Sequence, residues 1–179
     1  ARVREDCLRI LRFFGFPAWF GRGEPDAVAL TACGKLKDSL TTLPAERISK
    51  EFLKLLAAED PRAVIRLMAA SGVLSLILPK TQGLEAFERL VGIQTEQLFE
   101  DDAGIRLAAL LPPDPQAGRT VAKALRLSND LRDRLVAALG DTPAINSYLS
   151  PREARRAIYK LGHVAFRDRV KLGWSKAER

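Results

Sequence analysis

The chain has 179 residues, of which 47% are hydrophobic and only 7% aromatic, and its net charge is +7. That balance favours helix-on-helix packing over a β-sandwich. No stretch approaches the ~20 apolar residues of a membrane-spanning helix, which excludes a membrane span on this pattern.

The positive charge is concentrated in one part of the sequence. Residues 144–179 carry nine Lys or Arg and three Asp or Glu, whereas residues 85–102 carry one Arg and six Asp or Glu. A basic excess confined to one stretch indicates a polyanionic partner, with nucleic acid ahead of a membrane surface. The alternative is a basic surface that binds nothing.

The first stretch, REDCLRILRFFGF, predicts an amphipathic helix. Residues three and four apart are neighbours on a helix, so its charged residues form one stripe opposite an apolar face. The stripe consists of Arg2, Glu5, Arg9 and Arg12, with Asp6 also within reach of Arg9. Taken alone, such a stripe is ordinarily a set of solvated ion pairs worth a few tenths of a kcal/mol each.

Helical patterns recur along the rest of the chain. We expect helices over residues 25–40, 44–58, 61–71, 84–98, 101–111, 129–139, 151–161 and 164–174. The apolar segment SGVLSLILP is expected to form a short helix or buried turn, because no second strand is present to pair with it. The segment PPDPQAG, residues 112–118, predicts a linker.

Several residue pairs predict where helices begin and end. Asp60 before Pro61 is typical of an N-cap, and Ser128 should cap the helix that follows it. Ser150 and Glu153 have the spacing of a capping box, with Pro151 in the first turn. Together these signals predict an all-α protein of three consecutive helical modules.

Cysteine and histidine offer no catalytic or metal-binding pattern. Cys7 and Cys33 are far apart in sequence and match no metal or redox spacing, so we expect reduced, buried thiols in a cytoplasmic protein. His163 is the one histidine and cannot form a metal site alone, so a half-buried structural role is expected. The chain has neither an initiator Met nor a signal peptide, and we expect it to be part of a longer protein.

Two motifs, in order, resemble a known family. EDCLR places Glu5, Asp6 and Arg9 in an EDxxR pattern, and ERISKE places Glu46, Arg47 and Glu51 in an ERxxxE pattern about 40 residues later. The pair resembles the neck of bacterial tRNA nucleotidyltransferases, the CCA-adding enzymes, and of their relatives the bacterial poly(A) polymerases.

The resemblance implies a domain plan. Residues 1–57 would be the neck, which templates the base and binds RNA, 58–117 a helical body, and 118–179 a basic helical tail, either complete or truncated. In this family a catalytic head that binds magnesium precedes the neck. No such head is found in this sequence, so the chain alone should be inactive, with no catalytic or metal-binding residues of its own.

The resemblance also implies residue roles. Asp6 and Arg9 would read the base of the incoming CTP or ATP, Glu5 would support them, and Arg12 would contact nucleotide or RNA. The second motif would buttress this template helix, which gives a structural role to Glu46, Arg47 and Glu51.

The chemistry of Asp6 and Arg9 suits that role. Cytosine and adenine both present an exocyclic amine beside an unprotonated ring nitrogen. A carboxylate accepts from the amine and a guanidinium donates to the nitrogen, whereas uracil and guanine reverse both partners. Leaving a buried partner unpaired costs about 1–3 kcal/mol per group, so such a pair discriminates well.

The chain also departs from the family pattern. Gly15 stands where relatives commonly have another arginine, and Pro17 follows it, so the template helix should end or bend there. The motifs are shared by CCA addition to tRNA and poly(A) addition, and both readings stay open. A non-enzymatic helical RNA-binding module and a helical protein-interaction domain are the further alternatives.

The basic tail predicts contacts with the RNA backbone. Arg152, Arg156 and Lys160 share a helix face through their spacing of four residues. The same surface is expected to include Arg155, Arg167, Arg169 and Lys171. A solvated face that touches nothing is the alternative.

Overall fold

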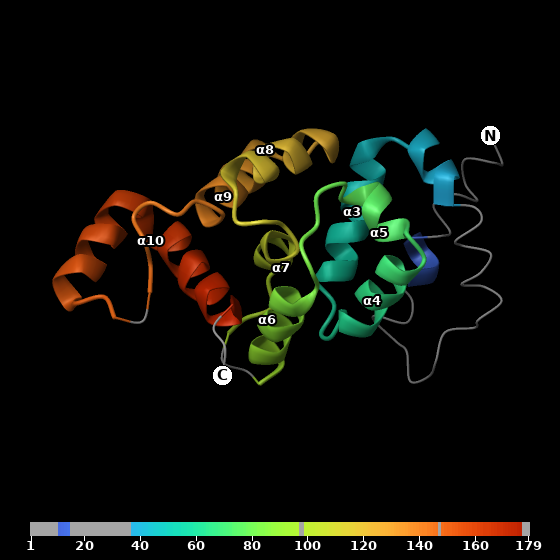
Figure 1. Ribbon diagram of the computed structural model, residues 1–179. Coiled ribbons are helices and arrows are strands. Elements are labelled where there is room, and N and C mark those ends of the chain that lie inside the picture. Colours follow the sequence, from blue (N-terminus) through green and yellow to red (C-terminus); the bar gives the residue numbers. More distant parts are fainter. Residues whose placement is uncertain (1–10, 15–36, 97–98, 147, 177–179) are drawn as a thin grey trace.

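The computed structural model describes residues 11–14, 37–96, 99–146 and 148–176, and every regular element in them is helical (Figure 1). Residues 11–14 form a helical turn. The later elements are the 3-10 helix η1 (Lys37–Thr42), α3 (Ala45–Leu56), α4 (Arg62–Ala70), α5 (Val73–Ile77), α6 (Glu85–Thr95), α7 (Ala103–Ala109), α8 (Pro115–Ala124), α9 (Asn129–Ala138) and α10 (Pro151–Lys176). The predicted all-α fold is confirmed.

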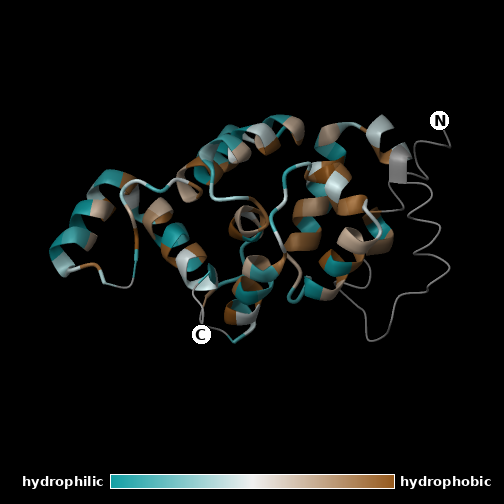
Figure 2. Ribbon diagram, in the orientation of Figure 1, coloured by the Kyte–Doolittle hydropathy of each residue, from teal (hydrophilic) through white to brown (hydrophobic). Residues whose placement is uncertain are grey.

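The helices form an elongated array. Helices α3, α4 and α5 lie at one end, α6 and α7 in the middle, and α10 at the other end, with α8 packed on α9 (Figure 1). Hydrophobic residues are concentrated in the helices of the α3–α5 end and in α6, whereas the outer segment of α10 is mostly hydrophilic (Figure 2). The described part of the chain contains no helix that is long and apolar enough to cross a membrane.

One hydrophobic cluster runs through the array. It begins at Leu11 and Phe14, continues through Phe52 and Phe87, and reaches Leu172 in α10. The cluster passes both of the expected module boundaries, at 57 and 117, without a break. The division into three modules itself stays a prediction.

The predicted caps at Ser128 and Ser150 are confirmed. The Ser128 hydroxyl accepts a hydrogen bond from the Leu131 N–H at 3.3 Å. At the start of α10 the Glu153 carboxylate accepts from the Ser150 N–H at 2.9 Å, and the Ser150 hydroxyl accepts from the Glu153 N–H at 3.3 Å. This reciprocal pair is the expected capping box. The cap predicted at Asp60 is wrong by one residue, because α4 begins at Arg62 with Pro61 in the N-cap position, although Asp60 Oδ1 still accepts from the Arg62 N–H at 3.1 Å.

Two predicted boundaries were wrong. The expected linker 112–118 is largely helix, because Asp114 caps α8 by accepting from the Gln116 N–H at 2.8 Å and Pro115 occupies the first turn. Helix α6 ends at Thr95 rather than near residue 98. Of the expected helix 25–40, residues 25–36 lie outside the described residues, and the remainder belongs to η1.

Helix α10 consists of two straight segments joined at Gly162. This glycine has φ 78° and ψ 163°, a backbone conformation that is essentially restricted to glycine. The segments 151–161 and 163–176 therefore meet at an angle, and the first one extends away from the body of the molecule (Figure 1).

Candidate nucleic-acid interface

The expected template helix lies almost entirely outside the described residues. This applies to Glu5, Asp6 and Arg9, whose roles stay predictions. The turn 11–14 is described, and in it Leu11 and Phe14 are buried whereas the Arg12 side chain is 64% exposed. The alternation of an apolar inner face and a charged outer face agrees with the expected amphipathic pattern.

Arg12 and Glu51 connect the two sequence motifs. The Arg12 Nε lies 3.8 Å from the Glu51 Oε1 on α3. The contact is long and Arg12 is largely exposed, so it contributes little stability by itself. It places Glu51 of α3 beside the turn 11–14.

The other two residues of that motif face different surroundings. Glu46 accepts a hydrogen bond from Arg126 Nη1 at 2.7 Å, from the end of α8. Its own backbone N–H and then Arg126 hold the pKa of Glu46 below its ordinary value. Arg47 is exposed. Together with Lys50 and Lys54, which are also exposed, it forms a basic stripe along α3.

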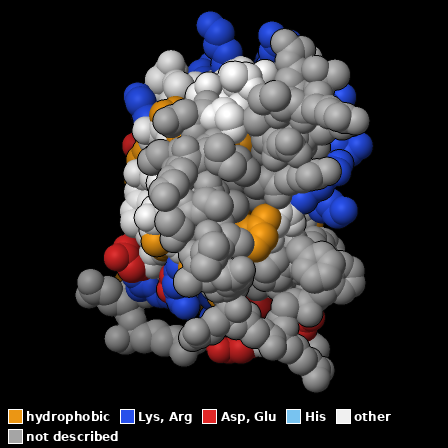
Figure 3. All heavy atoms as spheres, turned by 90° about the vertical axis from the view of Figure 1, so that its right-hand side faces the viewer, with side chains coloured by type: hydrophobic (Ala, Val, Ile, Leu, Met, Phe, Trp, Pro, Cys, Tyr) orange, Lys and Arg blue, Asp and Glu red, His pale blue; other side chains and the backbone are white. Residues whose placement is uncertain are grey.

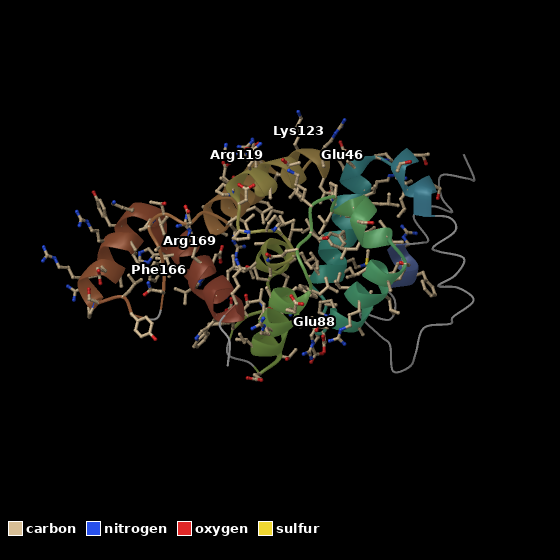
Figure 4. All side chains as sticks on the ribbon, in the orientation of Figure 1. Glu46, Glu88, Arg119, Lys123, Phe166 and Arg169 are labelled. Atoms are coloured by element: carbon tan, nitrogen blue, oxygen red, sulfur yellow. The ribbon has the colours of Figure 1, made fainter. Side chains whose placement is uncertain are left out.

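A second basic stripe on α8 was not predicted. Arg119 and Lys123 are exposed, are four residues apart, and lie along the same edge of the molecule as Glu46 (Figure 4). In the view onto the α3–α5 end, Lys and Arg side chains gather along the upper and right-hand edges (Figure 3). The four-residue spacing was visible in the sequence, but the segment before it was interpreted as a linker rather than as the start of a helix.

Helix α10 carries several exposed cations and, among its described residues, a single exposed carboxylate, Glu153. The exposed basic residues of α10 up to position 170 are Arg152, Arg155, Arg156, Lys160 and Arg167. None of these five forms an ion pair with a described residue. Both carboxylates of the helix are engaged elsewhere: Glu153 in the capping box, and Asp168, 1% exposed, with Arg134 Nε at 2.6 Å.

Two residues that were expected on this basic face serve the fold instead. Arg169 donates from Nε to the Ala137 carbonyl at 2.7 Å and from Nη1 to the Pro143 carbonyl at 3.2 Å, and burial lowers its pKa. Lys171 is buried, with its Nζ 4.8 Å from the centre of the Phe99 ring. The second segment of α10 packs on α6 and α9, so its inward cations are used for packing.

Two arginines, the buried Arg106 and the half-buried Arg134, fix the body on which these basic surfaces lie. Arg106 is fully buried and donates to the backbone carbonyls of Leu56, Ala58 and Glu59, as well as to Gln94 and Asp101.

Arg134 joins three helices. It donates from Nη2 to Asp102 Oδ2 at 2.6 Å and from Nε to Asp168 at 2.6 Å, which ties α7, α9 and α10 together. Hydrogen bonding to Asp168 is the largest cause that raises the pKa of Arg134. Sequence reasoning missed both arginines because all of their hydrogen-bond acceptors except Gln94 and Asp101 lie more than 30 residues away.

Metal-binding chemistry has no support in the part of the chain that the structure describes. No group of three His, Cys, Asp or Glu side chains there is arranged to hold an ion. His163 is exposed, so its expected half-buried role was wrong; the bend at Gly162 lifts it off the core. Cys7 and Cys33 lie outside the described residues.

The sequence and the fold of this chain are similar to those of known proteins. A family model described as "Probable RNA and SrmB- binding site of polymerase A" matches residues 25–84. The CCA-adding enzyme of Latilactobacillus sakei is 31% identical over 140 residues, which cover 77% of this chain and 35% of that protein. These matches support a region of the family of CCA-adding enzymes and poly(A) polymerases.

Other members of the family match at similar levels. The mitochondrial CCA tRNA nucleotidyltransferase 1 of Mus musculus is 35% identical over 95 residues, which cover 50% of this chain and 21% of that protein. A solved structure of a CCA-adding enzyme in complex with CTP superposes with a TM-score of 0.68 at 19% identity, covering 97% of this chain and 44% of that one, and so shares the fold. The chain spans about a third of the length of the CCA-adding enzyme of L. sakei.

Proposed function

We propose that this chain is the RNA-binding helical part of a nucleotidyltransferase that adds CCA to tRNA. The observation that carries the proposal is the row of exposed cations on α10, where both carboxylates are occupied by other partners. Lys and Arg that are free of ion pairs are available to neutralise phosphates. The similarity to a family with an RNA-binding region supports RNA as the partner that carries these phosphates. The relatives are named as CCA-adding enzymes, which favours tRNA as that RNA. Poly(A) addition is the second candidate activity.

A tRNA titration over about 50–200 mM salt tests this proposal. Each phosphate contact releases counterions, so the logarithm of the binding constant falls with the logarithm of salt by nearly one unit per contact. The double variant R156Q/K160Q should bind tRNA more weakly and flatten that slope by roughly one to two units.

The matched control is K80Q/R132Q. It removes the same net charge from exposed positions outside α10. Equal slopes for wild type and R156Q/K160Q would remove α10 from the RNA-binding surface. If both double variants flatten the salt dependence of tRNA binding equally, only the overall charge of the protein attracts RNA.

The proposed base template requires a different assay. In a nucleotidyltransferase that contains these 179 residues, Asp6→Ala should abolish the preference for CTP and ATP over UTP and GTP, because the carboxylate that accepts from the exocyclic amine is lost. Single-nucleotide incorporation with each of the four triphosphates measures it. Wild-type incorporation ratios in the variant would reject Asp6 as the base reader. Asn at the same position keeps the size of the side chain and serves as the control for shape.

A further inference from the structure

Two aromatic side chains lie on either side of the bend in α10 without a place in the core. The Tyr159 side chain is 92% exposed, three residues before Gly162. Phe166 is half-buried and lies between the two segments of the helix (Figure 4). Neither belongs to the hydrophobic cluster or is packed against it. Their exposure therefore has no explanation in the stability of the fold.

A groove opens beside the bend. It has a volume of about 480 Å³ and is lined by His163, Val164, Phe166, Arg167 and Val170. Cavities of roughly 300–1,000 Å³ are typical of sites that take small organic groups. Apolar walls with one guanidinium and one imidazole at the rim suit a flat, partly polar ring such as a nucleobase.

The side of the second segment that faces the groove is separate from the side that packs on the body. His163, Phe166 and Val170 recur at intervals of three and four residues and so share one face. The buried residues Ala165, Asp168 and Leu172 have the same spacing on another face, toward the body. The groove is therefore an outward surface of the helix, not a gap in the core.

The charge around the groove indicates the kind of partner. Tyr159 lies on the same exposed face as Arg155 and Arg156, and Arg167 belongs to the groove itself. Of the two carboxylates of α10, Asp168 is buried against Arg134, and the exposed Glu153 accepts hydrogen bonds in the capping box. Aromatic rings set among unpaired cations combine the two elements of single-strand recognition, base stacking and phosphate neutralisation.

We propose that the bend of α10 binds unpaired nucleotides of RNA, with one base in the groove against Phe166 and another stacked on Tyr159. This rests on the proposed RNA-binding function and adds that the bound segment is unpaired. Paired bases already stack on one another and present no free ring face, whereas bases in loops can be splayed out onto aromatic side chains. The neighbouring cations hold the phosphates of the same segment.

The test compares two RNAs of equal phosphate number, a hairpin with an unpaired loop and a blunt duplex, binding to the full 179-residue chain. Wild type should bind the hairpin more tightly. Tyr159→Ala and Phe166→Leu should each weaken hairpin binding by roughly fivefold or more and leave duplex binding unchanged. Tyr159→Phe keeps the ring and should keep the affinity.

A spectroscopic readout separates stacking from an indirect effect. The fluorescent base 2-aminopurine, placed in the hairpin loop, should be quenched by wild type and less so by Phe166→Leu, which keeps an apolar side chain in the groove. Tyr159 is so exposed that its replacement should not alter the melting temperature.

The outcomes distinguish this inference from the function on which it rests. Absence of binding to either RNA would overturn the RNA-binding proposal itself. Equal binding of hairpin and duplex, or variants that weaken both alike, would overturn only the unpaired-base site. Binding to phosphatidylserine vesicles that Tyr159→Ala weakens equally would also overturn it, in favour of a membrane surface.

Discussion

The side chain of Arg106 is fully buried, yet every nitrogen of its guanidinium donates a hydrogen bond. Three of its acceptors are the carbonyls of Leu56, Ala58 and Glu59, where α3 ends and the chain turns toward α4. The last carbonyls of a helix have no partner within it, and a buried helix end needs one from elsewhere. Arg106 supplies that partner from α7.

We expect Arg106→Met to lower the free energy of unfolding by several kcal/mol, on the order of 3–5. The substitution leaves several buried acceptors unpaired, at about 1–3 kcal/mol each. Urea unfolding measures the change. Arg132→Met, at an exposed position, should change stability by less than about 0.5 kcal/mol. A loss below about 1 kcal/mol for Arg106→Met would mean that water replaces the guanidinium without cost.

Asp102 predicts a pH dependence of stability. Burial alone would raise its pKa, but hydrogen bonds from Arg134 and from the backbone N–H groups of Ile105 and Gly104 outweigh burial and hold it below 3.8. A carboxyl whose pKa is lower in the folded state stabilises the fold above the unfolded-state pKa. That stabilisation is lost as the pH falls through the folded-state pKa.

The difference in unfolding free energy between wild type and Asp102→Asn should therefore be largest near neutral pH and shrink below about pH 3.8. Asparagine still caps α7 but cannot form the ion pair with Arg134. Denaturant titrations at a series of pH values measure the difference. A difference that stays constant down to pH 2 would mean that the charge of Asp102 does not contribute.

At the scale of the element, sequence reasoning succeeded where the signal was local. The caps at Ser128 and Ser150 were predictable because donor and acceptor lie within three residues. The prediction of a linker at 112–118 was wrong because Asp and Pro, which are typical of loops, are also typical of the first positions of a helix, as Asp114 and Pro115 are here. Arg106 and Arg134 were unpredictable because most of their partners are distant in sequence, and arginines are ordinarily expected at the surface.

The bend in α10 gives a prediction about one backbone position. An added Cβ at Gly162 would meet no atom within 4 Å, so only backbone strain opposes a substitution there. Gly162→Ala should cost about 1–3 kcal/mol or reorient the first segment, and tRNA affinity should fall with it. Differential scanning fluorimetry and tRNA binding measure the two effects.

Gly173 offers the control within the same helix. It also has open space around its Cα, but its backbone is helical. Gly173→Ala should leave tRNA affinity unchanged and stabilise the helix by roughly 0.5–1 kcal/mol. If Gly162→Ala behaves like Gly173→Ala, the bend is not fixed by glycine.

For the whole molecule, the continuous hydrophobic cluster predicts cooperative unfolding. Helices on both sides of position 57, and on both sides of position 117, bury side chains in the same cluster. No one of the three modules is therefore fully packed without its neighbour. Calorimetry should show a single transition whose van't Hoff and calorimetric enthalpies agree. Two separate transitions would instead show that the modules expected from the sequence unfold independently.

The hydrogen bonds of Arg106 also have a consequence for the order of events on the ribosome. The carbonyls between α3 and α4 are released from the exit tunnel some 50 residues before the side chain that satisfies them. A nascent chain that ends at residue 84, where the match to the RNA-binding family model stops, contains those acceptors without their donor. We expect such a chain to remain a loosely packed intermediate, open to proteases and chaperones, until α7 has emerged and docked.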